Sequence, residues 1–300
     1  MAKPSTASYG CGSDLVTPEL ACAVLSYRDE PFLVDAVRSV IDQGVPVEVV
    51  VVNSGGGAPA ERLAAAGLRI PVYSFQERLY PGAARNVGID ATHARFVAFL
   101  AADCVAAPGW VAGRLREHGA GAAAVASALT NAYPESTAAW ASLLLLHNRR
   151  LALDRPSQRL LYSLSYDRSL FHRFGRFRED LRAGEDTEFN ARLHSEVRVV
   201  LAPDAHTAHR YPTDARAMLR DAYRRGRLHA RMQGAIEGRG PRSVKVATRG
   251  PRNVIRSLVI ARRTSAPERG RLLRAWPLVL AGGVVYALGA LSASRGTFAD

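Results

Sequence analysis

The first hundred residues alternate between short hydrophobic runs and amphipathic stretches. Residues 21–25 (ACAVL) and 47–52 (VEVVVV) are runs typical of strands that are buried on both faces of a parallel sheet. Between them, residues 31–43 predict a helix, because the apolar positions recur at helical spacing and form one face. These apolar positions are Phe32, Leu33, Ala36, Val37, Val40 and Ile41. The pattern is therefore strand, helix, strand, for which a right-handed crossover is expected.

The same alternation continues along the chain. It predicts a helix over 59–66, a strand over 72–75, a helix from Pro81, and strands over 96–100, 121–126 and 197–202. Such an order is typical of an α/β fold with a doubly wound, mostly parallel sheet flanked by helices. Ligands bind at the carboxyl ends of the strands in such sheets, so residues 53–57 and 101–104 are predicted to border the site.

Charge is distributed unevenly between the two parts of the chain. Residues 1–212 carry 22 residues of each sign, whereas Thr213 to Asp300 hold 18 Lys and Arg against 5 Asp and Glu, a surplus of 13. This surplus indicates a polyanionic partner for the tail, either anionic lipid or nucleic acid. The sequence therefore predicts a basic helical segment over 213–274.

The last part of the tail is apolar. Residues 275–294 contain no charged side chain and are just long enough to span a bilayer, although their glycines weaken that interpretation. The segment is predicted either to span the membrane or to lie in its interface. Arginines immediately before it predict that the preceding part of the chain lies at the cytoplasmic face of the cell membrane. Because a soluble nucleic-acid-binding protein has no use for such a segment, nucleic acid is the less favoured partner.

The remaining composition sets the expected compartment. Cys11, Cys22 and Cys104 are odd in number and form no CxxC pair, which argues against a disulfide framework and a structural zinc site and favours a reducing compartment. Residues 1–19 lack the pattern of a signal peptide and are expected to form a flexible arm. The sheet domain is predicted over 20–212.

The order of five motifs carries a resemblance to a known family. The motifs are AVLSYRDEPFLVDAVRSVIDQ with VEVVVVNSGG, YPGAARNVGI, FVAFLAADCVAAPGW, GRFREDLRAGEDTEFNARL and AHTAHRYPTD. Together they resemble the family 2 glycosyltransferases of GT-A fold, from about Ala21 to Met232. The resemblance implies an inverting enzyme that transfers a sugar from a nucleotide-diphospho-sugar donor to a glycan or lipid-linked acceptor.

The resemblance also implies a divalent metal site at Asp103. Residues 101–103 stand where the family has its Asp-x-Asp motif, whose last acid binds Mg²⁺ or Mn²⁺ at the donor's diphosphate. A hard cation with oxygen ligands neutralises the charge that develops on the leaving group. The first acid of the motif is replaced by Ala101, which puts donor affinity in question. His209 matches the family's metal or pyrophosphate histidine better than His206 does.

Asp186 and Glu185 lie at the start of a predicted helix over 187–193. Acidic residues are favoured at helix N-termini for electrostatic reasons alone, but the resemblance implies that Asp186 is the general base and that Glu185 contacts the acceptor or supports the base. An inverting transfer needs one carboxylate near the acceptor hydroxyl.

The donor-binding residues implied by the resemblance follow the strands. Ser26, Tyr27 and Glu30 come after the first strand, where the family contacts the base and ribose. Asn53 stands where an Asp is common, and Arg85 matches a motif near the diphosphate, where it would clamp phosphate. Ala101 and Asn53 leave open a catalytically silent GT-A subunit, and the arginine-rich tail leaves open a nucleic-acid-binding protein.

Overall fold

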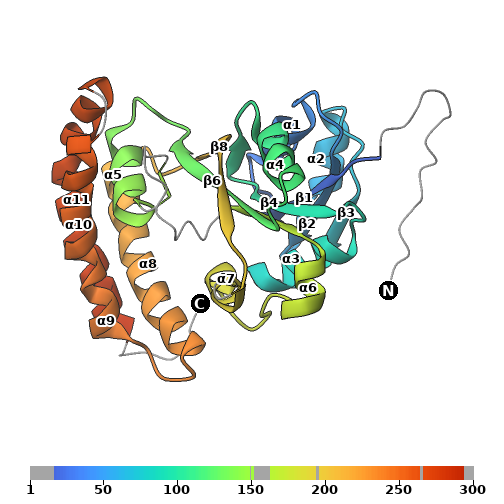
Figure 1. Cartoon of the computed structure of the whole chain (residues 1–300). Helices are drawn as coiled ribbons and strands as arrows, with labels where there is room; N and C mark the ends of the chain where they lie inside the picture. The colour runs from blue at the N-terminus through green and yellow to red at the C-terminus, as the bar shows by residue number, and fades with distance from the viewer. Residues whose placement is uncertain (1–16, 149, 152–162, 194–195, 264–265, 294–300) are drawn as a thin grey trace.

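The computed structural model describes residues 17–148, 150–151, 163–193, 196–263 and 266–293, and Figure 1 shows their arrangement. At the centre lies one eight-stranded sheet of order β3-β2-β1-β4-β7-β6-β8-β5. The strands are β1 (Leu20–Tyr27), β2 (Glu48–Ser54), β3 (Val72–Phe75), β4 (Phe96–Ala101), β5 (Cys104–Ala106), β6 (Ala124–Asn131), β7 (Leu164–Asp167) and β8 (Val199–His209). The flexible arm predicted over 1–19 lies outside the described residues as far as residue 16.

Seven helices accompany the described strands. They are α1 (Leu33–Ile41), α2 (Pro59–Ala65), α3 (Pro81–Asp90), α4 (Trp110–Gly119), α5 (Thr137–Leu146), α6 (Ser169–Phe174) and α7 (Glu185–Leu193). Side chains of α1, α2 and α4 pack on one face of the sheet, and those of α3, α6 and α7 pack on the other. The predicted doubly wound α/β arrangement is therefore confirmed.

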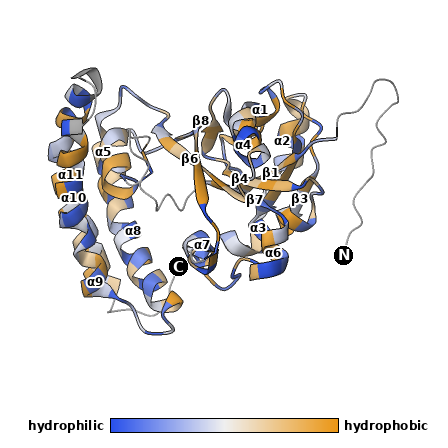
Figure 2. Ribbon diagram, viewed as in Figure 1, coloured by the Kyte–Doolittle hydropathy of each residue, from blue (hydrophilic) through white to orange (hydrophobic). Residues whose placement is uncertain are grey.

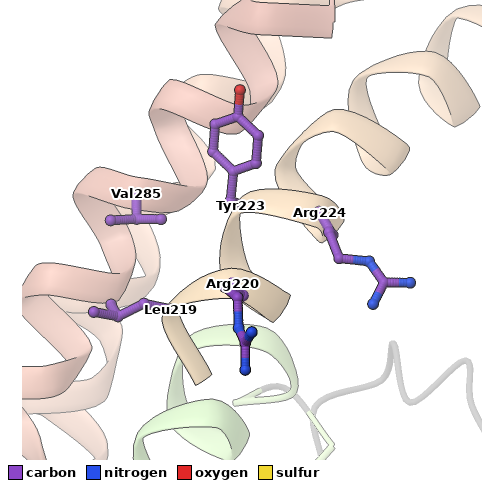
Figure 3. Close-up of a pocket in the computed structure, with 5 residues that line it drawn as sticks. All are labelled: Leu219, Arg220, Tyr223, Arg224 and Val285. Atoms are coloured by element: carbon purple, nitrogen blue, oxygen red, sulfur yellow. The ribbon is translucent and has the colours of Figure 1, made fainter. Parts of the chain in front are cut away.

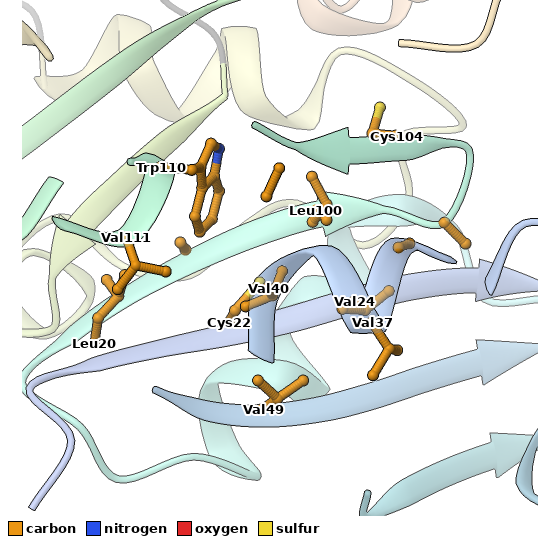
Figure 4. Packing of buried hydrophobic residues seen from close by; sticks show 14 of the residues in the cluster. Leu20, Cys22, Val24, Val37, Val40, Val49, Leu100, Cys104, Trp110 and Val111 are labelled. Atoms are coloured by element: carbon orange, nitrogen blue, oxygen red, sulfur yellow. The ribbon is translucent and has the colours of Figure 1, made fainter. Parts of the chain in front are cut away.

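The alternation of side chains along β1 explains the two cores. Cys22 and Val24 point into the core under α1 and α4, where Trp110 is fully buried (Figure 4). Ala21 and Ala23 point into the core on the opposite face. Both sets are buried because helices cover both faces of a parallel sheet, which is why the strand reads as a continuous hydrophobic run. Figure 2 shows the hydrophobic residues concentrated in these strands.

Two strands depart from the parallel order. The β7 strand pairs antiparallel with both β4 and β6, and β5 pairs antiparallel with β8. Both strands are short, and the sequence analysis did not predict them, because three or four residues are too few to show a period. Their positions depend on the partner strands rather than on local pattern.

Four further helices form a layer beyond α5 (Figure 1). They are α8 (Ala215–Ile236), α9 (Ser243–Ala247), α10 (Arg249–Arg263) and α11 (Ala266–Ser292). We call these four helices the C-terminal layer. Its buried side chains join those of α5 in one core, which connects the layer to the sheet domain. The boundary predicted between residues 274 and 275 falls inside α11.

The glycines of α11 are packing residues. A Cβ on Gly289 would lie 2.1 Å from the carbonyl oxygen of Tyr223 in α8, and one on Gly226 would lie 2.1 Å from that of Tyr286 in α11. The α8 and α11 backbones therefore touch, and only glycine fits at these two positions. From the sequence alone, the glycines of residues 275–294 indicate only a weak spanning helix, because their packing partners lie far away in the chain.

Candidate functional site

The carboxyl ends of β1 and β2 carry the first part of the site. Ser26 and Asn53 are paired in the parallel register, and both are buried. The Asn53 amide nitrogen donates to the carbonyl of Gly56 at 2.8 Å and so holds the following turn. Among the described residues, the Ser26 hydroxyl and the Asn53 carbonyl oxygen have no hydrogen-bond partner. Since unpaired buried polar atoms are costly, these two atoms are suited to a polar ligand.

The glycine turn after β2 is shaped by close contacts with the residues after β1. Gly55 and Gly57 have φ values of 81° and 94°, and a Cβ on Gly55 would lie 2.6 Å from the Tyr27 ring. The Asp29 carboxylate accepts a hydrogen bond from the backbone of Ala58 at 3.0 Å. The turn therefore packs against one edge of the Tyr27 ring, so closely that a side chain at residue 55 would collide with it.

Tyr27 is surrounded by positive charge. Its ring is 38% exposed, and the guanidinium groups of Arg28 and Arg78 each lie 5.0 Å from its centroid. An aromatic face with two arginines offers stacking for a base and charge for a phosphate. Arg28 and Arg78 were missed in the sequence, because nothing local distinguishes them from surface arginines. Glu30 is half-buried, and its backbone carbonyl accepts from Arg62 at 2.8 Å.

Asp103 and His209 are brought together by the pairing of β5 with β8. Cys104 lies opposite His209 in that ladder, and the His209 Nε2 atom is 3.7 Å from a carboxylate oxygen of Asp103. The Asp103 side chain is 41% exposed, whereas that of His209 is 15% exposed. Ligand atoms of Asp103, Cys104 and His209 lie within 4.8 Å of one another. This juxtaposition requires β5, a strand that the sequence did not reveal.

The electrostatics of this group favour an oxygen and nitrogen donor set. Burial lowers the pKa of His209, although Asp103 opposes that shift, so the imidazole is neutral and able to bind a cation. Burial raises the pKa of the Cys104 thiol well above its usual range, so the sulfur is a protonated and poor ligand. The ring of His209 stacks on Tyr211 at 4.3 Å, which fixes its orientation.

Glu185 and Arg85 form a buried ion pair. The Arg85 Nε atom donates to the Glu185 carboxylate at 3.0 Å, and the guanidinium lies over the rings of Phe99 and Phe177, with its carbon 5.0 and 5.4 Å from their centroids. Burial raises the pKa of Glu185, and Arg85 opposes that shift. The phosphate-clamp role of Arg85 stays a prediction, and the structure shows this guanidinium engaged with the acidic motif.

The PGAARN segment fixes the loop that leads to that motif. The Asn86 amide donates to the carbonyl of Phe177 at 3.0 Å and accepts from the Phe177 amide at 3.1 Å. Gly82 lies directly under the backbone of Arg178, where a Cβ would come within 2.0 Å of a carbonyl oxygen. Asn86 thus ties α3 to the chain entering α7, a role that its position in a helix did not indicate.

Asp186 is the second residue of α7, next to this ion pair, and is half-buried. One of its carboxylate oxygens accepts from the backbone and hydroxyl of Thr187, at 2.6 and 3.3 Å. The preceding Gly184 has φ of 84°, and a Cβ there would lie 2.3 Å from the sulfur of Met232 in α8. The acidic motif therefore contacts the C-terminal layer, which the sequence analysis did not foresee.

Solved structures of similar fold include two glycosyltransferases. A mannosyltransferase from Pyrobaculum calidifontis, solved with GDP-Man and Mn²⁺, is 17% identical with a TM-score of 0.58, over 93% of this chain and 88% of that one. The TarS 1–349 fragment of S. aureus is 16% identical with a TM-score of 0.51, over 93% and 92% of the two chains. These likenesses show the GT-A fold.

Sequence comparison adds a curated relative and a family. The succinoglycan biosynthesis protein ExoO of Rhizobium meliloti is 35% identical over 94 residues, which are 30% of this chain and 27% of that protein. The profile of the family described as Glycosyl transferase family 2 matches residues 22–179, more than half of the chain. These residues contain the glycine turn, Asp103 and the loop toward the acidic motif. The chain therefore belongs to glycosyl transferase family 2.

Proposed function

We propose that this chain transfers a sugar from a nucleotide-diphospho-sugar to a glycan or lipid-linked acceptor, with inversion and with the help of Mg²⁺ or Mn²⁺. The observation that carries the proposal is the pairing of Asp103 with His209 at the carboxyl edge of the sheet. The fold relatives are described with GDP-Man and Mn²⁺ in one case and with UDP-GlcNAc in the other. The site fits such donors.

The residues present fit a divalent cation. Asp103 offers a half-exposed carboxylate and His209 a neutral imidazole, and the buried Nδ1 atom of His209 has no hydrogen-bond partner among the described residues. A cation bound there would neutralise the charge on the nucleoside diphosphate that leaves. The backbone of Arg210 donates to the Asp103 carbonyl at 3.0 Å and so holds the turn between β4 and β5 from which the carboxylate projects.

The chain's own residues supply the rest of the reaction. Asp186 accepts the proton of the acceptor hydroxyl as that oxygen attacks the anomeric carbon from the side opposite the diphosphate. The Arg85–Glu185 pair holds the first turn of α7 in place, so that Asp186 is oriented before the acceptor arrives. Ser26, Tyr27, Glu30 and Asn53 surround the donor's nucleoside.

We place the enzyme at the cytoplasmic face of a membrane. The support is the basic C-terminal layer and the α11 segment Arg269–Ser292, which in the described part of the chain is long and apolar enough to cross a bilayer, with a mean hydropathy of 1.6. The proposed acceptor is accordingly a cell-envelope glycan or lipid-linked precursor. An anionic membrane is a better partner than nucleic acid for a surface that combines basic residues with an apolar helix.

The proposal is tested by thermal shift with GDP, UDP and their sugars, with Mn²⁺, with Mg²⁺ and with EDTA. A ligand that binds the folded chain raises its melting temperature. Asp103→Ala should remove the metal-dependent part of the shift, while Asp42→Ala, at an exposed residue that ends α1, should keep it. An unchanged metal-dependent shift in the Asp103 variant would reject this site.

A turnover assay with the same nucleotide-sugars, together with an oligonucleotide-binding assay, separates the alternative functions. A catalytically silent GT-A subunit would bind nucleotide but turn over no donor with any acceptor. A nucleic-acid-binding protein would show no nucleotide-sugar shift and would bind oligonucleotides through its arginine-rich helices. Turnover of a nucleotide-sugar in the presence of metal contradicts both.

A further inference from the structure

The outer face of α11 is apolar along its length. Leu273, Leu280, Val284, Leu288 and Leu291 are 40 to 62% exposed, and their spacing places them on one stripe of the helix. Pro277, Ala281 and Ala287 share that stripe. Soluble proteins rarely leave so long an apolar surface in contact with water.

The opposite face of α11 is fully engaged. Ala275, Val279, Tyr286 and Ala290 are buried in the core that α11 shares with α5, α8 and α10. The Tyr286 hydroxyl is 2.8 Å from the Nδ1 atom of His229 in α8. A helix crossing a bilayer would have to leave these partners and the backbone contacts at Gly226 and Gly289. The structure therefore presents only one side of α11 for a further contact.

A groove extends the apolar stripe onto α8. Leu219 and Tyr223 of α8 and Val285 of α11 line a space of about 410 Å³, with Arg220 and Arg224 at its border. Figure 3 shows the two α8 side chains beside Val285, with the Arg224 guanidinium turned away from α11. An apolar surface thus lies next to guanidinium groups. An amphiphile with an anionic head group needs both, because its hydrocarbon part contacts apolar side chains and its head group pairs with arginine.

The α10 helix adds a similar mixed surface. Ile255 and Val259 are 63 and 42% exposed, and Arg252 and Arg262 are exposed on the same side of the helix.

Acidic groups do not oppose this charge. From 215 to 292, the acids whose side chains the structure describes are Asp221 and Glu237. Asp221 pairs with Arg225 at 2.7 Å, and Glu237 pairs with Arg242 and Lys245. The outer surface of the layer is therefore apolar and basic. A second copy of this chain would bring like charges together, whereas an anionic bilayer complements both properties.

We infer that the C-terminal layer lies flat on an anionic phospholipid bilayer, with the exposed stripe of α11 in the interface and the arginines of α8 and α10 on the lipid phosphates. This inference deepens the membrane location proposed above, because it replaces a spanning helix by an in-plane surface. It depends on the packing of the layer and not on the chemistry at Asp103.

Binding is measured by flotation of the full chain with vesicles of phosphatidylcholine alone or with phosphatidylglycerol. Val284→Glu with Leu288→Glu should lower partitioning about 100-fold, from roughly tenfold per buried side chain. Arg220→Gln with Arg224→Gln should lower partitioning to anionic vesicles by about fivefold per arginine and weaken its salt dependence. Ala64→Glu with Ala65→Glu, on exposed positions of α2, is the matched control and should bind as the parent does.

The depth of α11 in the bilayer distinguishes a helix that lies in the interface from one that spans the membrane. A fluorophore is attached at Leu280→Cys or Leu291→Cys in a Cys11→Ser chain, where only the introduced cysteine is labelled because Cys22 and Cys104 are buried. In an in-plane helix both positions lie at the same depth, so shallow spin-labelled lipid should quench the two fluorophores equally. Depths that differ across the bilayer would overturn the in-plane arrangement in favour of a spanning helix. Unchanged vesicle binding by the glutamate variant, or a dimer of the parent that this variant dissociates, would also overturn it. Metal-dependent nucleotide binding by that variant should persist, so failure at the membrane and failure at the donor site are read separately.

Discussion

The sheet domain and the C-terminal layer differ in where they place their charged and apolar side chains. In the sheet domain, the charged groups of Arg85 and Glu185 beside the site are buried and paired, with the guanidinium over two aromatic rings. In the layer, arginines stay on the outside and apolar side chains such as Val284 remain exposed beside them. This difference accords with the proposals that the first region binds the donor and that the second lies on a membrane surface.

The difference extends to the use of glycine. In the sheet domain, Gly55, Gly57 and Gly184 adopt positive φ at turns that shape the site. In the layer, Gly226 and Gly289 have no such φ and serve to bring two helices into backbone contact. Substitutions in the two regions should therefore change different properties, function in the first and cohesion of the layer in the second.

The largest expected effect is on transfer by Asp186→Asn. Loss of a general base should lower the rate by roughly 10² to 10⁴, while metal-dependent nucleotide binding stays. Glu188→Gln, in the same turn but paired with Arg192, is the control. The product's anomeric configuration, read by NMR, should be opposite to the donor's. Retention of configuration, or a full rate in the Asp186 variant, would contradict the single-base mechanism.

Breaking the buried ion pair should cost stability. Arg85→Met leaves Glu185 buried without its partner, which costs about 3 to 5 kcal/mol of unfolding free energy. Because a protonated Glu185 avoids that cost, the deficit should be smaller at acidic than at neutral pH. Arg95→Met, whose pair with Asp167 has an arginine that is 68% exposed, should cost less than about 1 kcal/mol. Equal losses in denaturant titrations of the two variants would show that the pair is not effectively buried.

A substitution at the close backbone contact between α8 and α11 should destabilise the C-terminal layer. Gly289→Ala places a methyl group against the carbonyl of Tyr223 and should cost about 1 to 3 kcal/mol. Gly270→Ala, in the same helix but with open space around the new Cβ, should instead stabilise by up to about 1 kcal/mol. Thermal melts of both variants decide the matter, and a stable Gly289 variant would refute the close crossing of α8 and α11.

A smaller effect, shared by both regions, is expected on acidification. Burial lowers the pKa of His118 in the sheet domain to about 4 and that of His229 in the layer to about 3. Both are below the unfolded value of about 6.5, so their neutral forms contribute stability above that pH. This stability is lost as pH falls from about 6.5 toward the folded pKa, by up to about 1.4 kcal/mol per pH unit for each group.

The measurement is the unfolding free energy at pH 7.5 and 5.5 in the parent and in His118→Gln and His229→Gln. Each substitution should flatten the pH dependence. Two separate transitions at pH 5.5, of which only one responds to His229→Gln, would mean that the layer unfolds independently of the sheet domain. A slope that neither substitution changes would place the titrating groups elsewhere.

Much of the fold could be predicted from local pattern. The runs that became β1, β2 and β4 were recognisable because each is buried on both faces, and α1 because its apolar residues share one side. The short β5 and β7 could not be, since their positions depend on strands far along the chain. For the same reason the sequence could place Asp103 at a strand end but could not show its proximity to His209.

The site itself was predictable only in part. The family resemblance implied Ser26 and Asn53 as donor-binding residues, and the register of β1 with β2 sets them side by side. The partners of Arg85, by contrast, follow from the path of the loop before α7, which no local pattern encodes. The same holds for Met232 under Gly184, a contact between two segments that the sequence assigned to different regions.

The β5–β8 pairing also makes the site a possible cross-link. Asp103 and His209 lie in sequence on either side of about half of the sheet domain, including β6, β7 and the acidic motif. A cation held by both would close a loop of about 100 residues, and a covalent bond closing a loop of that length restricts the unfolded chain by about 4.7 kcal/mol. Metal occupancy would then act on the chain as a removable cross-link: binding of the metal would stabilise the folded chain, and its removal would withdraw that stabilisation.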